Sequence, residues 1–222
     1  MPLETIKYFA ILVKEFYALE PKSIEYQYSP FHIVAKSGDL PLFQFLLEKF
    51  GSRNLNPARK DGTTPLFLAA YLGHFEICKL IIQMVENKNP ARNDGPTPLY
   101  VAAQNGHFEI CQLILPEVEN KNPAKNDGIT PLHAAAYFGH LDVCKLISNE
   151  LEIKNPVSIT GDTPLHYAAK NGHVETFKFL ANSIRVLGDL TLKNDQGDTP
   201  LSLAEENNMD IFNTPLIFKI SN

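Results

Sequence analysis

A segment of 33 residues recurs along this chain with almost the same sequence. Each copy opens with Thr-Pro-Leu, continues with an Ala-Ala pair and then reaches Gly-His, and the copies begin at Thr64, Thr97, Thr130 and Thr163. A period of this length is typical of solenoid proteins, in which a single unit cannot bury its apolar face and must stack on its neighbours. We therefore expect an elongated stack with an extended contact surface, and not a globule built around one pocket.

Each part of the repeated segment has a local structural reason. Asp-Gly before the threonine, as at Asp127-Gly128, suits a tight turn in which the glycine has a positive φ, and it predicts a projecting hairpin. The threonine then caps a helix whose first residue is proline, a position that needs no N–H. The glycine of Gly-His is expected to end this helix in the left-handed conformation, and a second helix follows, such as His107 to Leu115. Pro116 predicts that this second helix ends or kinks early.

These residues resemble the ankyrin repeat, whose signature reads Asp-Gly-x-Thr-Pro-Leu-His-x-Ala-Ala-x-x-Gly-His followed by an apolar helix. The copy from Asp127 to His140 matches it nearly residue for residue, and weaker copies that begin at Ser29 and Gly197 flank the four good ones. The resemblance implies an all-α repeat solenoid of about six helix-turn-helix units with projecting β-hairpin loops. The expected divisions are a capping helix region at 1–28, an ankyrin repeat domain at 29–212 (approximate repeats 29–63, 64–96, 97–129, 130–162, 163–198 and 199–212) and an apolar tail at 213–222.

Charge and hydropathy exclude several classes of partner. The formal net charge of −5 leaves no basic surface for nucleic acid. No stretch approaches the roughly 18 uninterrupted apolar residues of a membrane helix, because charged residues interrupt the apolar start from Ile6 to Leu19. The same interruptions argue against a cleaved signal peptide. We therefore expect no nucleic-acid partner, no membrane insertion and an intracellular, cytoplasmic location.

All three cysteines and all seven histidines fall at repeat positions. Cys78, Cys111 and Cys144 occupy the same place in successive second helices. Packed helices lie about 8–10 Å apart, so the thiols are expected to be free, buried core groups in a reducing compartment, and not disulfides or metal ligands. The resemblance implies that the histidines hydrogen-bond backbone and hydroxyl groups that tie helices and hairpins together. No nucleophile elbow or phosphate loop accompanies them, so we expect neither an enzyme nor a cofactor.

The resemblance also implies where a partner would bind, since ankyrin proteins usually use the concave face formed by hairpin tips and the exposed side of the first helices. The helices would contribute the pair before each Gly-His, and apolar pairs alternate with polar ones: Tyr71-Leu72, Gln104-Asn105, Tyr137-Phe138 and Lys170-Asn171. The hairpins would contribute Thr63, Pro96, Ile129 and Asp162 with the tip residues beside them. The polar pairs show that the fold does not require apolar groups at this place. An exposed aromatic residue there is either an anchor for a partner or a lid over the neighbouring hairpin.

The function that these features predict is non-catalytic protein recognition by a scaffold or adaptor, acting as a monomer. The alternative is a structural module of a larger assembly. It would be the arm of a longer protein, or it would self-associate through the N-terminal helix expected at 2–19 or the apolar tail from Asn213 to Ile220. That helix is apolar on more than one side, which favours packing on the first repeat, with docking to another protein as the alternative. The tail either folds over the last layer or leads into a longer natural protein.

Overall fold

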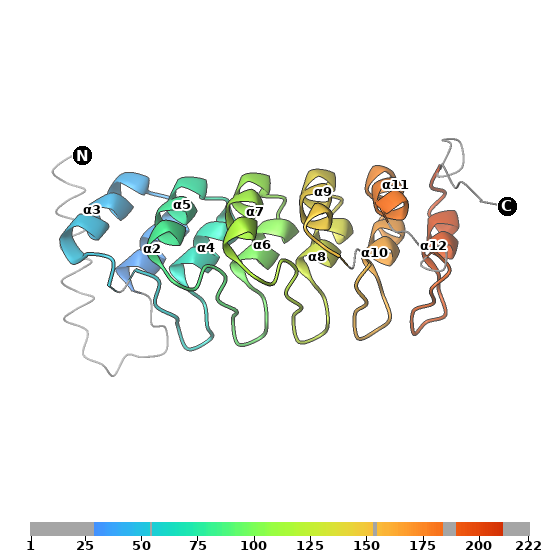
Figure 1. The fold of residues 1–222 in the computed structure, drawn as a ribbon, viewed down its shortest axis with the longest axis horizontal. Helices are drawn as coiled ribbons and strands as arrows, with labels where there is room; N and C mark the ends of the chain where they lie inside the picture. Colours follow the sequence, from blue (N-terminus) through green and yellow to red (C-terminus); the bar gives the residue numbers. More distant parts are fainter. Residues whose placement is uncertain (1–28, 54, 153–154, 184–189, 211–222) are drawn as a thin grey trace.

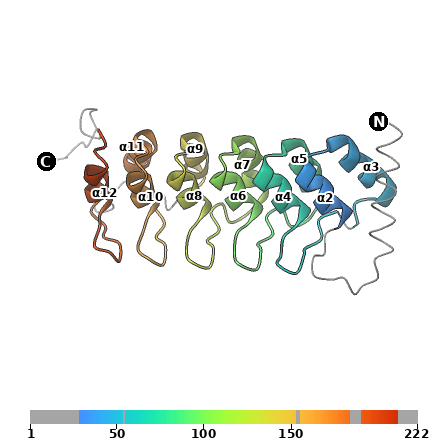
Figure 2. The same cartoon turned by 180° about the vertical axis from the view of Figure 1, so that it is seen from behind.

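The chain forms a straight row of stacked helix pairs. The computed structural model describes residues 29–53, 55–152, 155–183 and 190–210. These residues contain eleven α-helices and one 3-10 helix, and no strand. Figure 1 shows the helices in two layers, with loops that project from one side of the stack, and Figure 2 shows the same arrangement from behind. The all-α repeat solenoid expected from the sequence is confirmed. The helix expected at 2–19 and the tail at 213–222 lie outside the described residues.

The inner layer, which lies next to the projecting loops, consists of helices that begin at the proline of Thr-Pro-Leu or its equivalent. They are α2 (Pro30–Ser37), α4 (Pro65–Leu72), α6 (Pro98–Gln104), α8 (Pro131–Tyr137), α10 (Pro164–Lys170) and α12 (Pro200–Glu206). The residue before each proline caps its helix, as where the Thr130 side chain accepts a hydrogen bond from the backbone N–H of His133. This cap satisfies an N–H that the first helical turn leaves without a partner.

The outer layer consists of the second helix of each pair. Its members in the described residues are α3 (Leu40–Phe50), α5 (Phe75–Met84), α7 (Phe108–Ile114), α9 (Leu141–Asn149) and α11 (Val174–Ser183), with the 3-10 helix η1 (Leu115–Glu117) after α7. Helix α7 has 7 residues where α5 has 10. The early end expected at Pro116 is thus confirmed, because proline has no N–H for an α-helical hydrogen bond and the chain continues as one 3-10 turn.

The core runs between the two layers along the whole described stack. The leucine of Thr-Pro-Leu is fully buried in the four close copies, as are their Ala-Ala pairs, whose small side chains let successive inner helices approach closely. The thiols of Cys78, Cys111 and Cys144 are free and 0% exposed. Burial raises the pKa of the Cys111 and Cys144 thiols to about 12, and that of Cys78 further in the same direction. The prediction of free core thiols is therefore confirmed.

The loops between repeats are hairpin turns that also bond to one another. Each is closed by a backbone hydrogen bond across four residues, as from the N–H of Arg59 to the carbonyl of Thr63 at 2.8 Å. The turn glycine has a positive φ, for example +82° at Gly62. The N–H of Asn93 in the next hairpin donates to the carbonyl of Asp61 at 3.0 Å. In the described residues the hairpins are too short to form strands, and these cross-links hold them in line along one side of the stack.

Candidate functional site

The structure places the predicted residue pairs at the carboxyl ends of the inner helices. Tyr71 and Leu72 are 46% and 40% exposed, and Tyr137 and Phe138 are 42% and 48% exposed. At the same place in the intervening repeat, α6 carries the half-buried Gln104 and the exposed Asn105, and Lys170 and Asn171 are exposed at the end of α10. The stack therefore presents large apolar groups at two places where its fold also accepts polar ones.

Tyr137 of α8 contacts a further tyrosine, from α10. The ring of Tyr137 lies 4.8 Å from that of Phe138 and 5.8 Å from that of Tyr167, and both contacts are edge-to-face. We call Tyr137, Phe138 and Tyr167 the aromatic cluster. Sequence reasoning missed Tyr167, which follows His166 at a position where the previous repeat has Ala134. The signal in the sequence is that Tyr167 is the one aromatic residue at this position among the four close copies.

Phe138 has a second contact that bears on its role. Its ring stacks on the imidazole of His140, with 6.2 Å between centroids and 22° between planes. The Nε2 atom of His140 is 3.1 Å from the carbonyl oxygen of Gln104 in the preceding repeat. Phe138 thus covers a group that joins two repeats while about half of its own surface faces solvent, a geometry that fits both an anchor and a lid.

The predicted hairpin residues are less accessible than expected. Thr63 is 2% exposed, so its side chain is buried and does not form part of the exposed hairpin surface. The reason is that this position lies on the returning arm of the hairpin, where the Thr63 carbonyl oxygen is bound by His32 of the previous repeat. Pro96, Ile129 and Asp162 are half-buried. The exposed hairpin surface is formed instead by the tips: Lys60, Asn93, Asp94, Asn126, Asp127, Ile159, Thr160, Asp195 and Gln196.

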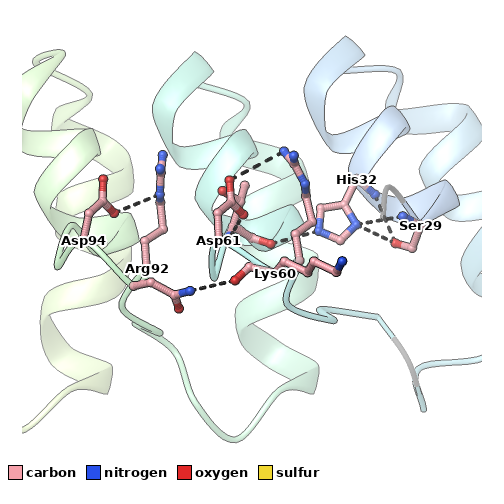
Figure 3. A network of polar contacts seen from close by, with 9 residues as sticks. Ser29, His32, Lys60, Asp61, Arg92 and Asp94 are labelled. Atoms are coloured by element: carbon pink, nitrogen blue, oxygen red, sulfur yellow. Dashed lines mark hydrogen bonds and ion pairs between the residues drawn. The ribbon is translucent and has the colours of Figure 1, made fainter. Parts of the chain in front are cut away.

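Histidines join the inner helices α2, α8 and α10 to the hairpin that follows each of them, as Figure 3 shows for His32. The backbone N–H of Ser29 donates to Nδ1 of His32 at 3.0 Å, and Nε2 of the same ring lies 3.1 Å from the Thr63 carbonyl oxygen. Burial lowers the pKa of His32 to about 4, although its hydrogen bond to Thr63 opposes this shift. The expected structural role of these imidazoles is therefore confirmed at this position, where the ring is neutral at physiological pH.

Ion pairs occupy the first three hairpins. The pairs are Arg59–Asp61 at 3.9 Å, Arg92–Asp94 at 3.1 Å and Lys125–Asp127 at 3.0 Å. Figure 3 shows the second of these. At the hairpin tips, the side-chain amide of Asn93 donates a hydrogen bond to the Lys60 carbonyl. The fourth hairpin has Ser158 and Thr160 at the corresponding positions, and their hydroxyl groups are 3.0 Å apart. A neutral hydroxyl pair thus replaces the ion pair in the fourth hairpin.

Carboxylates influence the phenol of Tyr167. Burial raises the pKa of Tyr167 to about 12, and the negative charges of Asp162 and Asp127 raise it further. Partial burial opposes ionisation of Asp127, yet the N–H of Ile129 and the ammonium of Lys125 hold the pKa of that carboxyl below its ordinary value. Burial and two nearby carboxylates therefore act together against ionisation of the Tyr167 phenol.

Other kinds of site find little support in the described part of the chain. Residues 29–53, 55–152, 155–183 and 190–210 contain no group of three or more side chains able to hold a metal ion. Among the same residues, no helix has the length and apolar character needed to cross a bilayer. A shallow depression lies on the outer layer between α7 and α9, lined by Phe108, Asp142, Lys145, Leu146 and Asn149.

Comparison with known proteins agrees with this geometry. A family model described as ankyrin repeats (3 copies) matches residues 4–90 and 82–156, and one described as ankyrin repeats (many copies) matches residues 132–181. No curated protein matched the chain in a sequence search. The matched segments span well over half of the 222 residues and include the helix pairs from α2 to α9 and the helix α10. The chain belongs to the ankyrin repeat family.

Proposed function

We propose that this protein is a scaffold or adaptor that binds a protein partner on its concave face, with the aromatic cluster at the centre of the site. Ankyrin repeats are generally protein–protein interaction modules and are typically non-catalytic. The observation that supports this site is that Tyr137 and Phe138 remain 42% and 48% exposed while contacting each other. The free buried thiols fit a reducing compartment, and we place the protein in the cytoplasm.

Aromatic residues held in this way suit binding. Tyr137 contacts rings on both sides, Phe138 in its own repeat and Tyr167 in the next. These contacts limit the rotamers that Tyr137 can adopt, so little side-chain entropy is lost when a partner covers it. Large amphipathic rings of this kind often supply most of the binding energy of a protein interface.

The test replaces Tyr137 with Gln and Phe138 with Asn, the pair that the chain already uses at 104 and 105. We expect the double variant to keep its melting temperature and to lose roughly 2 kcal/mol of partner affinity, about 30-fold in Kd. Partners would be captured from native cell extract and identified by mass spectrometry, and the affinity then measured by calorimetry. A companion variant, Tyr71→Gln with Leu72→Asn, removes the other predicted apolar pair, on α4, and shows how much of the affinity that pair contributes.

A different result would contradict the proposed binding site. If the melting temperature of the Tyr137→Gln, Phe138→Asn variant falls sharply while its folded fraction still binds the partner at full affinity, these residues are a lid that packs on the stack. The binding site would then lie elsewhere on the concave face.

Self-association remains the alternative function, and it depends on residues outside the described part of the chain. Sedimentation of the full chain separates the two proposals. A monomer supports recognition on the concave face, whereas an oligomer that is lost when residues 213–222 are removed supports assembly through the tail.

A further inference from the structure

One position of the inner helices, near their carboxyl ends, presents a regular series of side chains along the stack. Successive inner helices pack on one another and lie side by side in Figure 1, so the side chains at this position form a single row. From α2 to α10 the row reads Lys36, Tyr71, Gln104, Tyr137 and Lys170. We call these five residues the helix-end row. An amide lies at its centre, an aromatic ring lies on each side of the amide, and a cation lies at each end.

Exposed apolar surface is concentrated at two places in the helix-end row. Tyr71 is 46% exposed and is followed by Leu72, which is 40% exposed. Tyr137 is 42% exposed and is followed by Phe138, which is 48% exposed. The half-buried Gln104 lies between the two apolar pairs, one layer from each. The row therefore offers two apolar anchors that are separated by one polar repeat.

Gln104 has hydrogen-bonding groups that the stack does not use. No hydrogen bond joins its side-chain amide to any residue in 29–53, 55–152, 155–183 or 190–210. A primary amide has a donor and an acceptor, the same two groups as a peptide bond. In an extended segment the peptide groups are available to such a side chain, whereas in a helix they bond to one another. Gln104 therefore favours an extended segment over a helix as the bound partner.

The two lysines of the row are not paired within the described part of the chain. Neither Lys36 nor Lys170 forms an ion pair with another residue there. The aspartates at the tips of the first three hairpins, in contrast, pair with the cation two residues before them. The row thus carries unpaired positive charge although the net charge of the chain is −5. Acidic side chains at both ends of a bound segment would complement it.

The stacking of the helices sets the distances along the row. Packed helices lie about 8–10 Å apart, so Tyr71 and Tyr137, which are two layers apart, are separated by roughly 16–20 Å. An extended segment rises about 3.3 Å per residue and covers this distance in about five or six residues. A helix rises about 1.5 Å per residue and needs about 11–13. The separation of the two anchors in the partner sequence therefore distinguishes the two kinds of segment.

We propose that the helix-end row binds an extended segment of the protein partner, with two apolar residues about five or six positions apart and an acidic residue beyond each of them. The apolar residues contact the pairs that begin at Tyr71 and Tyr137, a peptide group between them bonds to Gln104, and the acidic residues face Lys36 and Lys170. This inference rests on the proposed function, whose partner it specifies, and it adds the α4 pair to the aromatic cluster as a second anchor.

One charge opposes this arrangement. Glu206 is exposed on α12 at the next place in the series, one layer beyond Lys170. It forms no ion pair with Lys170, so its negative charge acts against an acidic side chain at that end of the segment. Glu206→Gln is accordingly expected to tighten binding of an acidic peptide by roughly twofold at low salt.

The first experiment selects random peptides of about 16 residues on the full wild-type chain, with counter-selection on the Tyr137→Gln, Phe138→Asn variant. We expect the selected peptides to share two apolar residues about five or six positions apart. In one such peptide, glycines are added or removed between the two apolar residues, and each Kd is measured by calorimetry. Binding should weaken roughly tenfold when the separation is changed by about three residues, because only one anchor is then filled.

Variants of the row locate the contacts. Tyr71→Gln with Leu72→Asn should weaken the best peptide roughly tenfold and remove the dependence on separation, because one anchor remains. Gln104→Ala should weaken it roughly three- to fivefold. N-methylation of the peptide group between the anchors should weaken binding to the wild-type chain but not weaken binding to Gln104→Ala further. The row accepts lysine, tyrosine and glutamine at the same position, so these variants should keep their melting temperatures.

The charge contacts have their own comparison. Lys36→Gln with Lys170→Gln should weaken an acidic peptide roughly three- to tenfold at low salt and leave unchanged a peptide that has Gln in place of its acidic residues. Equal affinity of the acidic and the neutral peptide for the wild-type chain would overturn these contacts.

The results separate this inference from the proposed function. If the selected peptides depend on Tyr137 and Phe138 but show no preferred separation, or prefer about 11–13 residues, the extended two-anchor segment is wrong and the proposed site stands. The same holds if no peptide depends on the pair while a protein captured from cell extract does, since the partner then binds through a folded surface. If neither a peptide nor a captured protein depends on the pair, both proposals fail.

Discussion

At the scale of single residues, the glycine of Gly-His has two separate reasons to be glycine. Gly106 has a φ of +73°, a conformation that side chains with a Cβ rarely adopt. A Cβ added there would also lie 2.7 Å from the imidazole of His140 in the next repeat. Gly172 has nearly the same φ of +70°, but a Cβ there would meet open space, because Met209 stands in the place of that histidine in the sixth unit.

This difference between two glycines gives a matched pair of variants. Gly172→Ala should destabilise the protein by roughly 1–2 kcal/mol, the cost of a left-handed residue with a Cβ. Gly106→Ala should have the same backbone strain and should lose roughly a further 1–3 kcal/mol of stability, because the His140 ring must move. Urea unfolding of both variants measures the two effects. Equal destabilisation would mean that the contact with the imidazole carries no cost.

At the scale of elements, a buried histidine fixes the start of an inner helix against the following hairpin. His133 is 0% exposed. The backbone N–H of Thr130 donates to its Nδ1 at 3.2 Å, so the ring proton is on Nε2, which lies 3.1 Å from the Asp162 carbonyl oxygen and donates to it. Burial lowers the pKa of His133 to about 4, although the hydrogen bond to Asp162 opposes the shift. A protonated ring would set an N–H against the N–H of Thr130.

Stability should consequently fall in mild acid. The pKa of His133 is about 4 in the folded chain and about 6.5 in the unfolded chain, so between these values the unfolded chain binds a proton that the folded chain does not. The contribution is complete above pH 6.5 and is lost as the pH falls to 4, in total roughly 3 kcal/mol. His32 behaves in the same way. Because the pKa of Asp127 is lowered from 3.8, its contribution is lost at still lower pH.

The variant that checks this assignment is His133→Phe, which places at this position the residue found at Phe67. Between pH 6.5 and pH 4, the free energy of unfolding of this variant should fall less steeply than that of the wild type. The two slopes should differ by roughly 1.4 kcal/mol per pH unit, which corresponds to one proton. Denaturant melts across this range give the slope. An unchanged slope would show that His133 is protonated in the folded chain.

The same elements show what the sequence can and cannot predict. Helix starts and ends follow from local chemistry, since Thr130, the proline after it and Gly139 act through their own backbone and side-chain atoms. The burial of Thr63 and the contacts of Tyr167 depend on the register of one repeat against the next, which no local rule contains. Asn89 is a similar case: its side-chain oxygen accepts the N–H of Leu99, ten residues later, at 2.8 Å.

At the scale of the whole molecule, stability comes from contacts between neighbours. The inner helices α4, α6, α8 and α10 each pack on the inner helices before and after them and on the outer helix of their own pair. The hairpins also contact their neighbours in the row. The N–H of Ile159 donates to the carbonyl of Asp127, and the N–H of Asp195 donates to the carbonyl of Thr160, each at 3.0 Å. Loss of one layer therefore removes support from both adjoining layers.

A core variant in the middle of the stack tests this neighbour coupling. Leu132 is 0% exposed in α8, and Leu132→Ala should cost roughly 2–5 kcal/mol. Hydrogen exchange should show the largest loss of protection in α8, smaller losses in α6 and α10 and the least in α2. Uniform loss along all helices would indicate that the described stack opens as a single cooperative unit.

The equal spacing of the Gly-His contacts has a consequence for the length of the protein. A Cβ on Gly73 would lie 2.7 Å from His107, just as one on Gly106 would lie 2.7 Å from His140. Removal of residues 97–129 would therefore leave Gly73 opposite His140 with the same geometry. The number of repeats can thus change by whole units without any change at the junction between them. In the shortened chain, Tyr71 on α4 would lie beside Tyr137 on α8, and the two separated apolar pairs would form one continuous strip.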